Sequence, residues 1–330
     1  MDDIWPILAR VLVVFGIMGA GALARALNWL TSEADRSLMK LTVNLLLPCL
    51  LFHKLVTDDR LSGSDMIFPP IVGFGTVLLG FFVGVSVLAL LGRVIGFDGS
   101  AQKRAFVFCV GMYNYVYLPL PIAEQLFPSA VSTLMIFNVG VEIAMWTIGV
   151  MVLTGGTTSW PGALKRIINP PLMSIVAALV VRGLVRSEFL PVDVSSALAP
   201  TVHHLMNAVK IVGDCGVPMG LILSGAIMLE LLREADWRFG WKPFGVAAGL
   251  RLLVLPAIML VIARFAPIDV DLKRVLLLQA AMPSASFSIV LVRLYGQDAQ
   301  VALKIVVGTT LLALFTIPIW LIVGRTWLGV

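Results

Sequence analysis

The sequence predicts an all-α polytopic membrane protein made of two related halves, and three observations predict this fold class. Hydrophobic residues make up 59% of the 330 residues and charged residues only 13%, whereas a soluble domain carries about 25% charged residues. Apolar runs of about 20 residues, each long enough to cross a bilayer as a helix, recur along the chain. A shift of 170 residues also superposes two proline-containing breaks, at residues 111–121 and 280–288.

The apolar runs predict ten membrane-spanning helices. They cover residues 4–27, 37–57, 67–92, 104–126, 131–153, 168–187, 200–230, 243–265, 273–294 and 302–326. The only hydrophilic break longer than a tight loop, residues 155–166, separates five predicted helices from five. Because five is an odd number, the second half enters the membrane from the opposite side. We therefore expect an inverted repeat, with residues 1–157 and 165–330 related by a pseudo-two-fold axis in the membrane plane.

Basic residues predict the orientation of the chain. With the loops taken alternately, one side carries thirteen Lys and Arg residues, among them Arg104, Lys165 and Arg166, and the other side carries nine. Cytoplasmic loops carry the excess of basic residues in membrane proteins. We expect both termini outside, which is the periplasm for a bacterial inner membrane. Topology, rather than binding of nucleic acid, then accounts for the net charge of +5.

No motif in the sequence indicates an enzyme. We find no phosphate-binding loop, no metalloprotease helix and no nucleophile elbow. The cysteines Cys49, Cys109 and Cys215 all lie in apolar runs, and they offer neither a disulfide framework nor the spacing of metal ligands. We therefore expect no catalytic residue, no cofactor and no metal. With nothing to use ATP, the predicted carrier is a secondary one.

The prolines explain the two breaks. Proline lacks an N–H group, and its ring clashes with the carbonyl four residues earlier. The carbonyls that lose a helical donor in this way belong to Gln279, through Pro283, and to Tyr115 and Tyr117, through Pro119 and Pro121. In hydrocarbon an unpaired backbone group is costly, so such breaks persist only inside protein or beside a wet cavity.

A new half-helix is expected after each break, with unpaired N–H groups and the positive end of its dipole at the break. Asn114 and Ser284 superpose under the 170-residue shift, as do Pro48 and Pro218 in other apolar runs. Asparagine and serine are both good N-cap residues. Two half-helix N-termini near the midplane would bind an anion such as a carboxylate. The alternative interpretation is that the prolines only kink their helices.

Glu142 lies inside the fifth apolar run, within the segment FNVGVEIAMWTIGV at residues 137–150. An acid at mid-membrane is costly and is therefore a functional candidate by default. Glu142 could carry a proton for coupling or contact the substrate, and Asn138 lies one turn earlier on the same helix face. The alternative is a structural role in which Glu142 pairs with a buried base or hydroxyl.

The predicted substrate-binding residues lie at the two breaks and on the fifth helix: Asn114, Tyr113, Tyr115, Asn138, Glu142, Pro283, Ser284 and Ser286. The tyrosines offer aromatic surface for a ring. Lys210 and Asp214 are four residues apart and are expected to form a structural ion pair. Arg251 could attract an anion or extend to the interface. His53 could relay a proton or lie at the interface.

Three motifs carry a resemblance to a known family. They are VNLLLPCLLFHKL at residues 43–55, Asn114 followed by Pro121 seven residues later, and QAAMP at 279–283 with Tyr295-Gly296 beyond it. In this order and spacing they resemble the auxin efflux carrier family, which includes the plant PIN carriers and bacterial relatives. The resemblance covers essentially the whole chain.

The resemblance implies a fold and a mechanism. Ten helices would form an inverted five-plus-five repeat, similar to that of NhaA and the bile-acid symporters. Helices 1, 2, 6 and 7 would form a scaffold, and helices 3–5 with 8–10 a moving transport domain. Helices 4 and 9 would cross at their breaks and bind the substrate there, and Asn114 would be the asparagine at the crossing. Structural roles at the crossing and in its supporting helices would fall to Pro48, Pro119, Pro121, Pro218 and Gln279. Family members are often dimeric through the scaffold.

The chain departs from the family's pattern at four positions, of which two are Pro119, where the family often has glycine, and Leu51, where plant members often have serine before the Phe-His pair. Tyr113 stands where plant carriers often have the crossover proline, and Glu142 stands where they tend to have glutamine. An added acid beside the proposed anion site favours proton coupling.

Three functional hypotheses follow. The first is a secondary carrier of a small organic anion that works by an elevator-like movement, with indole acids and dicarboxylates such as malate or malonate both open. The second is a sodium- or proton-coupled importer resembling the bile-acid symporters. The third is an intramembrane receptor or enzyme, which predicts a nucleophile or metal dyad that is not visible. The direction of transport stays open.

Overall fold

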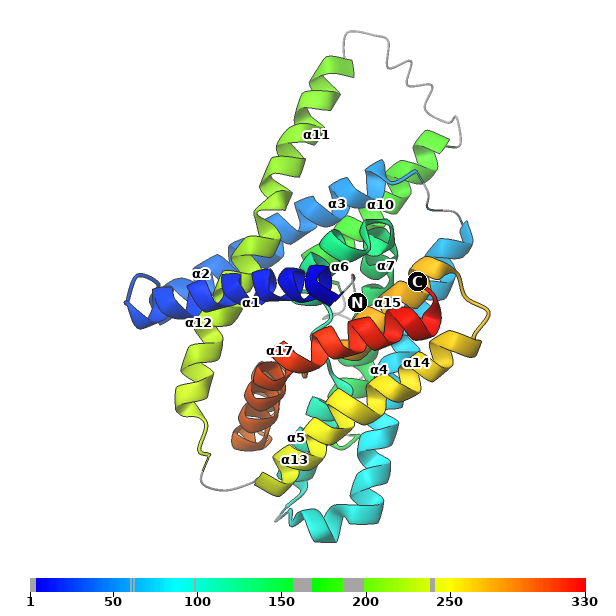
Figure 1. Cartoon of the computed structure of the whole chain (residues 1–330). Helices are drawn as coiled ribbons and strands as arrows, with labels where there is room; N and C mark the ends of the chain where they lie inside the picture. Colours follow the sequence, from blue (N-terminus) through cyan, green and yellow to red (C-terminus); the bar gives the residue numbers. More distant parts are fainter. Residues whose placement is uncertain are drawn as a thin grey trace.

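The computed structural model describes residues 4–59, 61, 63–97, 99–156, 168–186, 199–237 and 241–330, and all regular elements among them are helical (Figure 1). This confirms the predicted all-α class. Most of the predicted central loop, together with Lys165 and Arg166, lies outside the described residues.

The helices of the first half are α1 (Ile4–Ala26), α2 (Ser32–Leu41), the π-helical turn η1 (Thr42–Leu46), α3 (Leu47–Thr57), α4 (Gly63–Ile95), α5 (Ser100–Gly111), α6 (Pro119–Leu126), η2 (Pro128–Ala130), α7 (Val131–Ala144), η3 (Met145–Gly149) and α8 (Val150–Thr154). Those of the second half are α10 (Pro170–Arg186), α11 (Ala199–Asp214), α12 (Gly216–Glu234), α13 (Trp241–Gly249), η4 (Leu250–Val254), α14 (Leu255–Phe265), α15 (Val270–Ala281), α16 (Phe287–Leu294) and α17 (Ala299–Leu328).

Seven continuous helical stretches among the described residues are long and apolar enough to cross a membrane. The predicted fourth and ninth spans do not count among them, because each is interrupted: α5 is separated from α6 and α15 from α16. The predicted sixth span appears as a shorter apolar helix, Pro170–Leu184. The breaks predicted from the prolines are thus present, and the inverted orientation of the two halves stays a prediction.

Four prolines singled out in the sequence lie in the first turns of helices. Pro48 lies in the first turn of α3, Pro119 is the first residue of α6, Pro121 is its third, and Pro218 is the third residue of α12. For Pro119 and Pro121 the missing N–H costs little, because the first N–H groups of a helix have no helical acceptor. These two prolines lie where a helix restarts after the first break, whereas Pro48 and Pro218 lie inside the continuous helical stretches Ser32–Thr57 and Pro200–Glu234.

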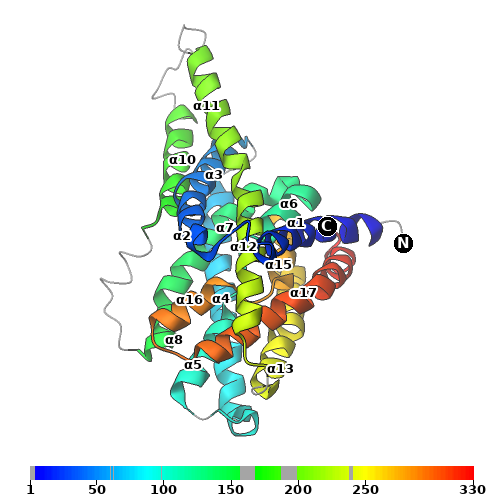
Figure 2. The ribbon, with the colours of Figure 1, turned by 90° about the vertical axis from the view of Figure 1, so that its left-hand side faces the viewer.

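The helices pack in two groups. The group of α1, α3, α10, α11 and α12 includes the close pairs α1 with α12 and α3 with α10, and the other group includes α4 with α7 and α15 with α14 and α17. Glycines allow the closest crossings: a Cβ on Gly140 would lie 1.7 Å from the Pro70 carbonyl oxygen, and one on Gly225 would lie 1.8 Å from that of Met18. In both views the start of α1 and the end of α17 lie on the same side of the molecule (Figures 1 and 2).

Candidate functional site at the paired helix breaks

The two breaks, 170 residues apart, are joined by their backbones. The Asn114 N–H donates to the Pro283 carbonyl over 2.8 Å, and the Ala285 N–H donates to the Met112 carbonyl over 3.1 Å. Tyr113 and Ser284 form the antiparallel bridge between these bonds. Four predicted site residues, Tyr113, Asn114, Pro283 and Ser284, therefore lie together.

The expectation that Asn114 and Ser284 cap the new half-helices is wrong. Helix α6 begins at Pro119 with Leu118 in the N-cap position, and α16 begins at Phe287 with Ser286 in that position. Asn114 and Ser284 instead lie in the extended backbone that pairs the two breaks. The Asn114 Oδ1 accepts a long bond of 3.4 Å from the Leu118 N–H. The Ser284 hydroxyl donates to the Cys109 carbonyl over 2.7 Å.

The start of α6 offers fewer N–H donors than expected, which corrects the prediction of a donor-rich N-terminus after the first break. Pro119 and Pro121 have no N–H group. The Leu120 N–H donates to the Val116 carbonyl over 3.1 Å, and the Leu118 N–H is the donor to Asn114. An anion at this helix end would therefore interact mainly with its dipole.

The start of α16 provides hydroxyl groups. Ser286 is half-buried at the N-cap position, and Ser288 is buried in the first turn. Within the described part of the chain, the Ser288 hydroxyl has no hydrogen-bond partner. A buried hydroxyl without a partner is costly, so this position is suited to a ligand that supplies an acceptor.

The carbonyl of Tyr115, which Pro119 leaves without a helical donor, is bound by two neutral amides. The Asn138 side chain donates to it over 2.8 Å and the Gln279 side chain over 3.2 Å. Gln279 also donates to the Asn138 Oδ1 over 2.9 Å. These bonds bring three predicted residues together from the first break, α7 and α15. The Gln279 Oε1 is buried and has no partner among the described residues.

Glu142 joins the same cluster through Tyr115. The Tyr115 hydroxyl donates to its carboxylate over 3.4 Å, and the Asn169 side chain donates to the other oxygen. Asn169 in turn accepts the Leu172 N–H over 2.9 Å and so caps the start of α10. The ion pairs found in the described ranges do not include Glu142. The carboxylate is thus bound by a hydroxyl and an amide, and not by a base.

The carbonyls at the second break are bound by a cation. Arg251, in η4, is only 1% exposed, so the expectation that its side chain extends to the interface is wrong. Its Nε donates to the Met282 carbonyl over 2.9 Å, and its Nη2 donates to those of Gln279 and Ala280 over 3.2 and 3.3 Å. Its guanidinium also lies 4.8 Å from the centroid of the Tyr113 ring.

The three tyrosines of the first break have different surroundings. Tyr113 is fully buried beneath Arg251, with its hydroxyl 2.7 Å from that of Thr76. Tyr115 and Tyr117 are half-buried. A Cβ on Gly220 would lie 2.4 Å from the Tyr117 ring, so this ring packs directly on α12. Only the latter two tyrosines retain exposed surface.

A cavity of about 260 Å³ lies beside the first break, between α6 and the helix group that contains α1 and α12. It is lined by Pro121 and Glu124 of α6 and by Pro218 of α12, among others. Glu124 forms an ion pair of 3.0 Å with Lys54. Polar and apolar groups therefore share the lining.

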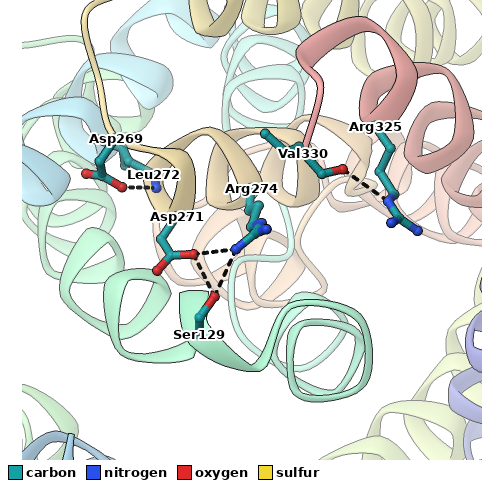
Figure 3. Close-up of polar contacts among 7 residues, drawn as sticks. All are labelled: Ser129, Asp269, Asp271, Leu272, Arg274, Arg325 and Val330. Carbon is teal, nitrogen blue, oxygen red and sulfur yellow. Dashed lines mark hydrogen bonds and ion pairs between the residues drawn. The ribbon is translucent and has the colours of Figure 1, made fainter. Parts of the chain in front are cut away.

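Ion pairs and caps elsewhere are structural. The predicted pair of Lys210 and Asp214 is confirmed at 2.6 Å. At the other end of α15, Asp271 bonds Ser129 over 2.7 Å and Arg274 over 2.9 Å, and Asp269 caps the helix by accepting the Leu272 N–H over 2.7 Å (Figure 3). This second polar cluster fixes the start of α15 against η2.

Three residues near the breaks were not identified from the sequence: Asn169, Ser288 and Thr309. Asn169 carried a usable signal, because an N-cap residue directly before Pro170 indicates a helix start. Nothing in the local sequence, however, indicates that Asn169 bonds to Glu142. The Thr309 hydroxyl accepts the Ser284 N–H over 3.3 Å, and no local pattern links two residues on different helices.

Comparison with known proteins gives concordant matches. Residues 6–159 and 162–321 match the family described as membrane transport protein. A protein of Methanothermobacter thermautotrophicus is 23% identical over 317 residues, which are 95% of this chain and 97% of that protein. A protein of Methanocaldococcus jannaschii is 26% identical over 320 residues, which are 94% of this chain and 96% of that protein. Both relatives are described as uncharacterized transporters.

Proposed function

The chain belongs to the auxin efflux carrier family of membrane transport proteins, and from this premise we propose that it is a secondary carrier of a small organic anion. Its place in a membrane transporter family, together with the seven helices in the described ranges that are long and apolar enough to cross a membrane, makes it an integral membrane transporter. The observation that carries the proposal is the pairing of two interrupted helices at Tyr113 and Ser284. Interrupted helices that meet inside a carrier typically form its substrate site.

The proposed substrate site combines the dipole of α16 with polar side chains at both breaks. Asn114 and Ser286 are half-buried, and Ser288 has an unpartnered hydroxyl in the described structure. A carboxylate placed there would accept from these groups at the positive end of a half-helix. Tyr115 and Tyr117, with surface still exposed, would contact the rest of the substrate, which is an indole acid or a dicarboxylate such as malate or malonate.

We propose an elevator mechanism within a ten-helix inverted repeat. The scaffold would consist of α1, α2–α3, α10 and α11–α12, and the remaining helices would move together with the substrate. Packing supports this division, because the closest helix pairs lie within the two groups. The cavity between α6 and α12 lies at the boundary, where a movement of one group against the other would open or close it.

Three further features belong to the proposal. Glu142 would couple transport to protons, since it is a membrane-embedded acid bound by neutral donors. Both termini would lie in the periplasm of a bacterial inner membrane, in keeping with the placement of the start of α1 and the end of α17 on one side (Figure 2). Two copies would associate through their scaffold helices.

A ligand screen tests the proposed function. Purified full-length protein is heated with indole acetate, malonate or malate, and with the corresponding neutral amides. A ligand of the native state raises the unfolding midpoint, so we expect one of the acids to raise it and its amide to have no effect. An effect of equal size from acid and amide, or from none of these compounds, would contradict an organic-anion site.

A further inference from the structure

The strongest electrostatic feature outside the proposed substrate contacts is the environment of Arg251. Its guanidinium is fully buried and donates to three carbonyls, those of Gln279, Ala280 and Met282, at 2.9 to 3.3 Å. The ion pairs observed across the described ranges include other arginines but not this one. A buried charge normally requires an opposite charge, and here backbone oxygens take that role.

The break creates this ring of oxygens. The last carbonyls of a helix lack their regular helical donors, and Pro283 has no N–H group to supply one. Of the three carbonyls, that of Gln279 also accepts the Met282 N–H, over 3.3 Å. These carbonyls also lie at the negative end of the α15 dipole. The face of the Tyr113 ring, 4.8 Å from the guanidinium, adds a further attraction for a cation. The carbonyls, the helix dipole and the Tyr113 ring therefore each favour a positive charge at this point, and together they offset the cost of burying it.

In carriers with broken helices, carbonyls at such half-helix ends coordinate the coupling sodium ion or proton. We propose that Arg251 is a tethered cation that occupies the place of a coupling sodium ion at the second break. The α15 end would then be ordered permanently, and transport would not require sodium. The claim that transport does not require sodium rests on the proposed function. The claim that the Arg251 side chain takes the place of a sodium ion does not depend on that function.

Arg182 provides a matched control. It is also a buried arginine, 5% exposed, and it donates to the carbonyls of Leu55 and Leu61 over 3.2 and 3.0 Å. These carbonyls belong to the end of α3 and the segment after it, and not to paired breaks. Its loss should therefore destabilise the protein without creating a sodium site.

The experiment compares unfolding midpoints in sodium chloride and in choline chloride of equal ionic strength. The wild type should show the same midpoint in both salts. Arg251→Met should be less stable in choline and should recover in sodium along a saturable curve, with matching binding of radioactive sodium. Arg251→Lys retains the positive charge, so its unfolding midpoint should be the same in sodium chloride and in choline chloride. Arg182→Met should lose stability equally in both salts.

Several outcomes would overturn the proposal. One is a folded Arg251→Met that neither binds sodium nor gains stability from it, and another is an equal sodium response of Arg182→Met. If Arg251→Met does not fold, Arg251→Gln, which keeps an amide donor and removes the charge, takes its place. Saturable sodium binding by the wild type refutes the proposal without any variant. Because no substrate is used, failure of the organic-anion screen and failure of this proposal remain distinguishable.

Discussion

The first and second helix breaks bind each other, yet they are stabilised by different chemistry. At the first break the Tyr115 carbonyl is bound by the neutral amides of Asn138 and Gln279. At the second break three carbonyls are bound by the charged Arg251. Hydrogen bonds from a charged donor are roughly twice as strong as neutral ones, so the second break should be the more rigid of the two.

The side chains packed beside the two breaks also differ in charge. Under the 170-residue shift, Arg251 corresponds to Phe81. The Phe81 ring lies 6.0 Å from that of Phe108, and a Cβ on Gly111 would lie 2.2 Å from Phe81. An apolar ring thus fills the place in the first half that a cation takes in the second. The two breaks thus differ in charge, since a buried cation binds the second and neutral amides bind the first, which lies beside the cavity.

The largest expected effect tests this difference directly. Arg251→Met removes the charged donor from three buried carbonyls, of which only that of Gln279 keeps a second donor in the described structure, the Met282 N–H. We expect it to destabilise the protein by on the order of 3 kcal/mol in the absence of sodium. The measurement is the unfolding midpoint in detergent. A midpoint within error of the wild type in choline chloride would show that the second break does not depend on the charge.

Loss of the neutral amide of Gln279 should destabilise the protein less than loss of the Arg251 charge. Gln279→Leu removes two hydrogen bonds, but the Tyr115 carbonyl keeps the donor from Asn138. We expect a destabilisation of about 1 kcal/mol, measured in the same way. Gln297→Leu, at a half-buried glutamine that bonds its own turn, is the control. A loss as large as that of Arg251→Met would remove the distinction between the two breaks.

Asn114→Ala should separate binding from stability. Among the described residues its side chain makes one hydrogen bond, a long one of 3.4 Å, so we expect a change in stability below about 1 kcal/mol. The stabilising effect of the organic anion should nevertheless disappear. Asn44→Ala, in η1, removes an exposed asparagine bond to Lys40 and serves as the control. Unchanged affinity in Asn114→Ala would exclude this residue from the substrate site.

Glu142→Gln should have the smallest effect on stability, because the amide oxygen can accept from Asn169 while the amide nitrogen donates to the Tyr115 hydroxyl, which can also act as an acceptor. Its effect should appear in transport into proteoliposomes measured as a function of pH. We expect the wild-type rate to vary with pH and the variant rate to be flat, with substrate binding retained. Glu124→Gln, at the ion-paired acid of the cavity, should keep the pH dependence. A variant with the wild-type pH profile would exclude Glu142 as the coupling acid.

Much of the site could be predicted because prolines act locally. Pro119 and Pro283 interrupt their helices through groups within four residues, and the two breaks were placed correctly. The prediction that Asn114 and Ser284 cap the half-helices was wrong. These residues have the right chemistry for a cap, but pairing with the other break holds both in an extended backbone.

The residues that bind the freed carbonyls also depend on tertiary structure. Arg251 was identified as a lone charge in an apolar run, and nothing nearby in sequence indicates that it reaches α15, 28 residues later. The same holds for Asn169, which binds Glu142 across 27 residues. A donor and its acceptor on different helices have no spacing rule, since helix packing decides which faces meet.

The sequence by itself determined the membrane class, the all-helical fold and the position of both breaks, because hydropathy and the missing proline N–H act over one helix at most. Only the tertiary structure decided how each break is stabilised. An unpaired carbonyl inside a membrane must find a donor, and the donor that packing brings near is neutral at Tyr115 and charged at Met282. The two breaks therefore differ in the charge of the donor that stabilises them.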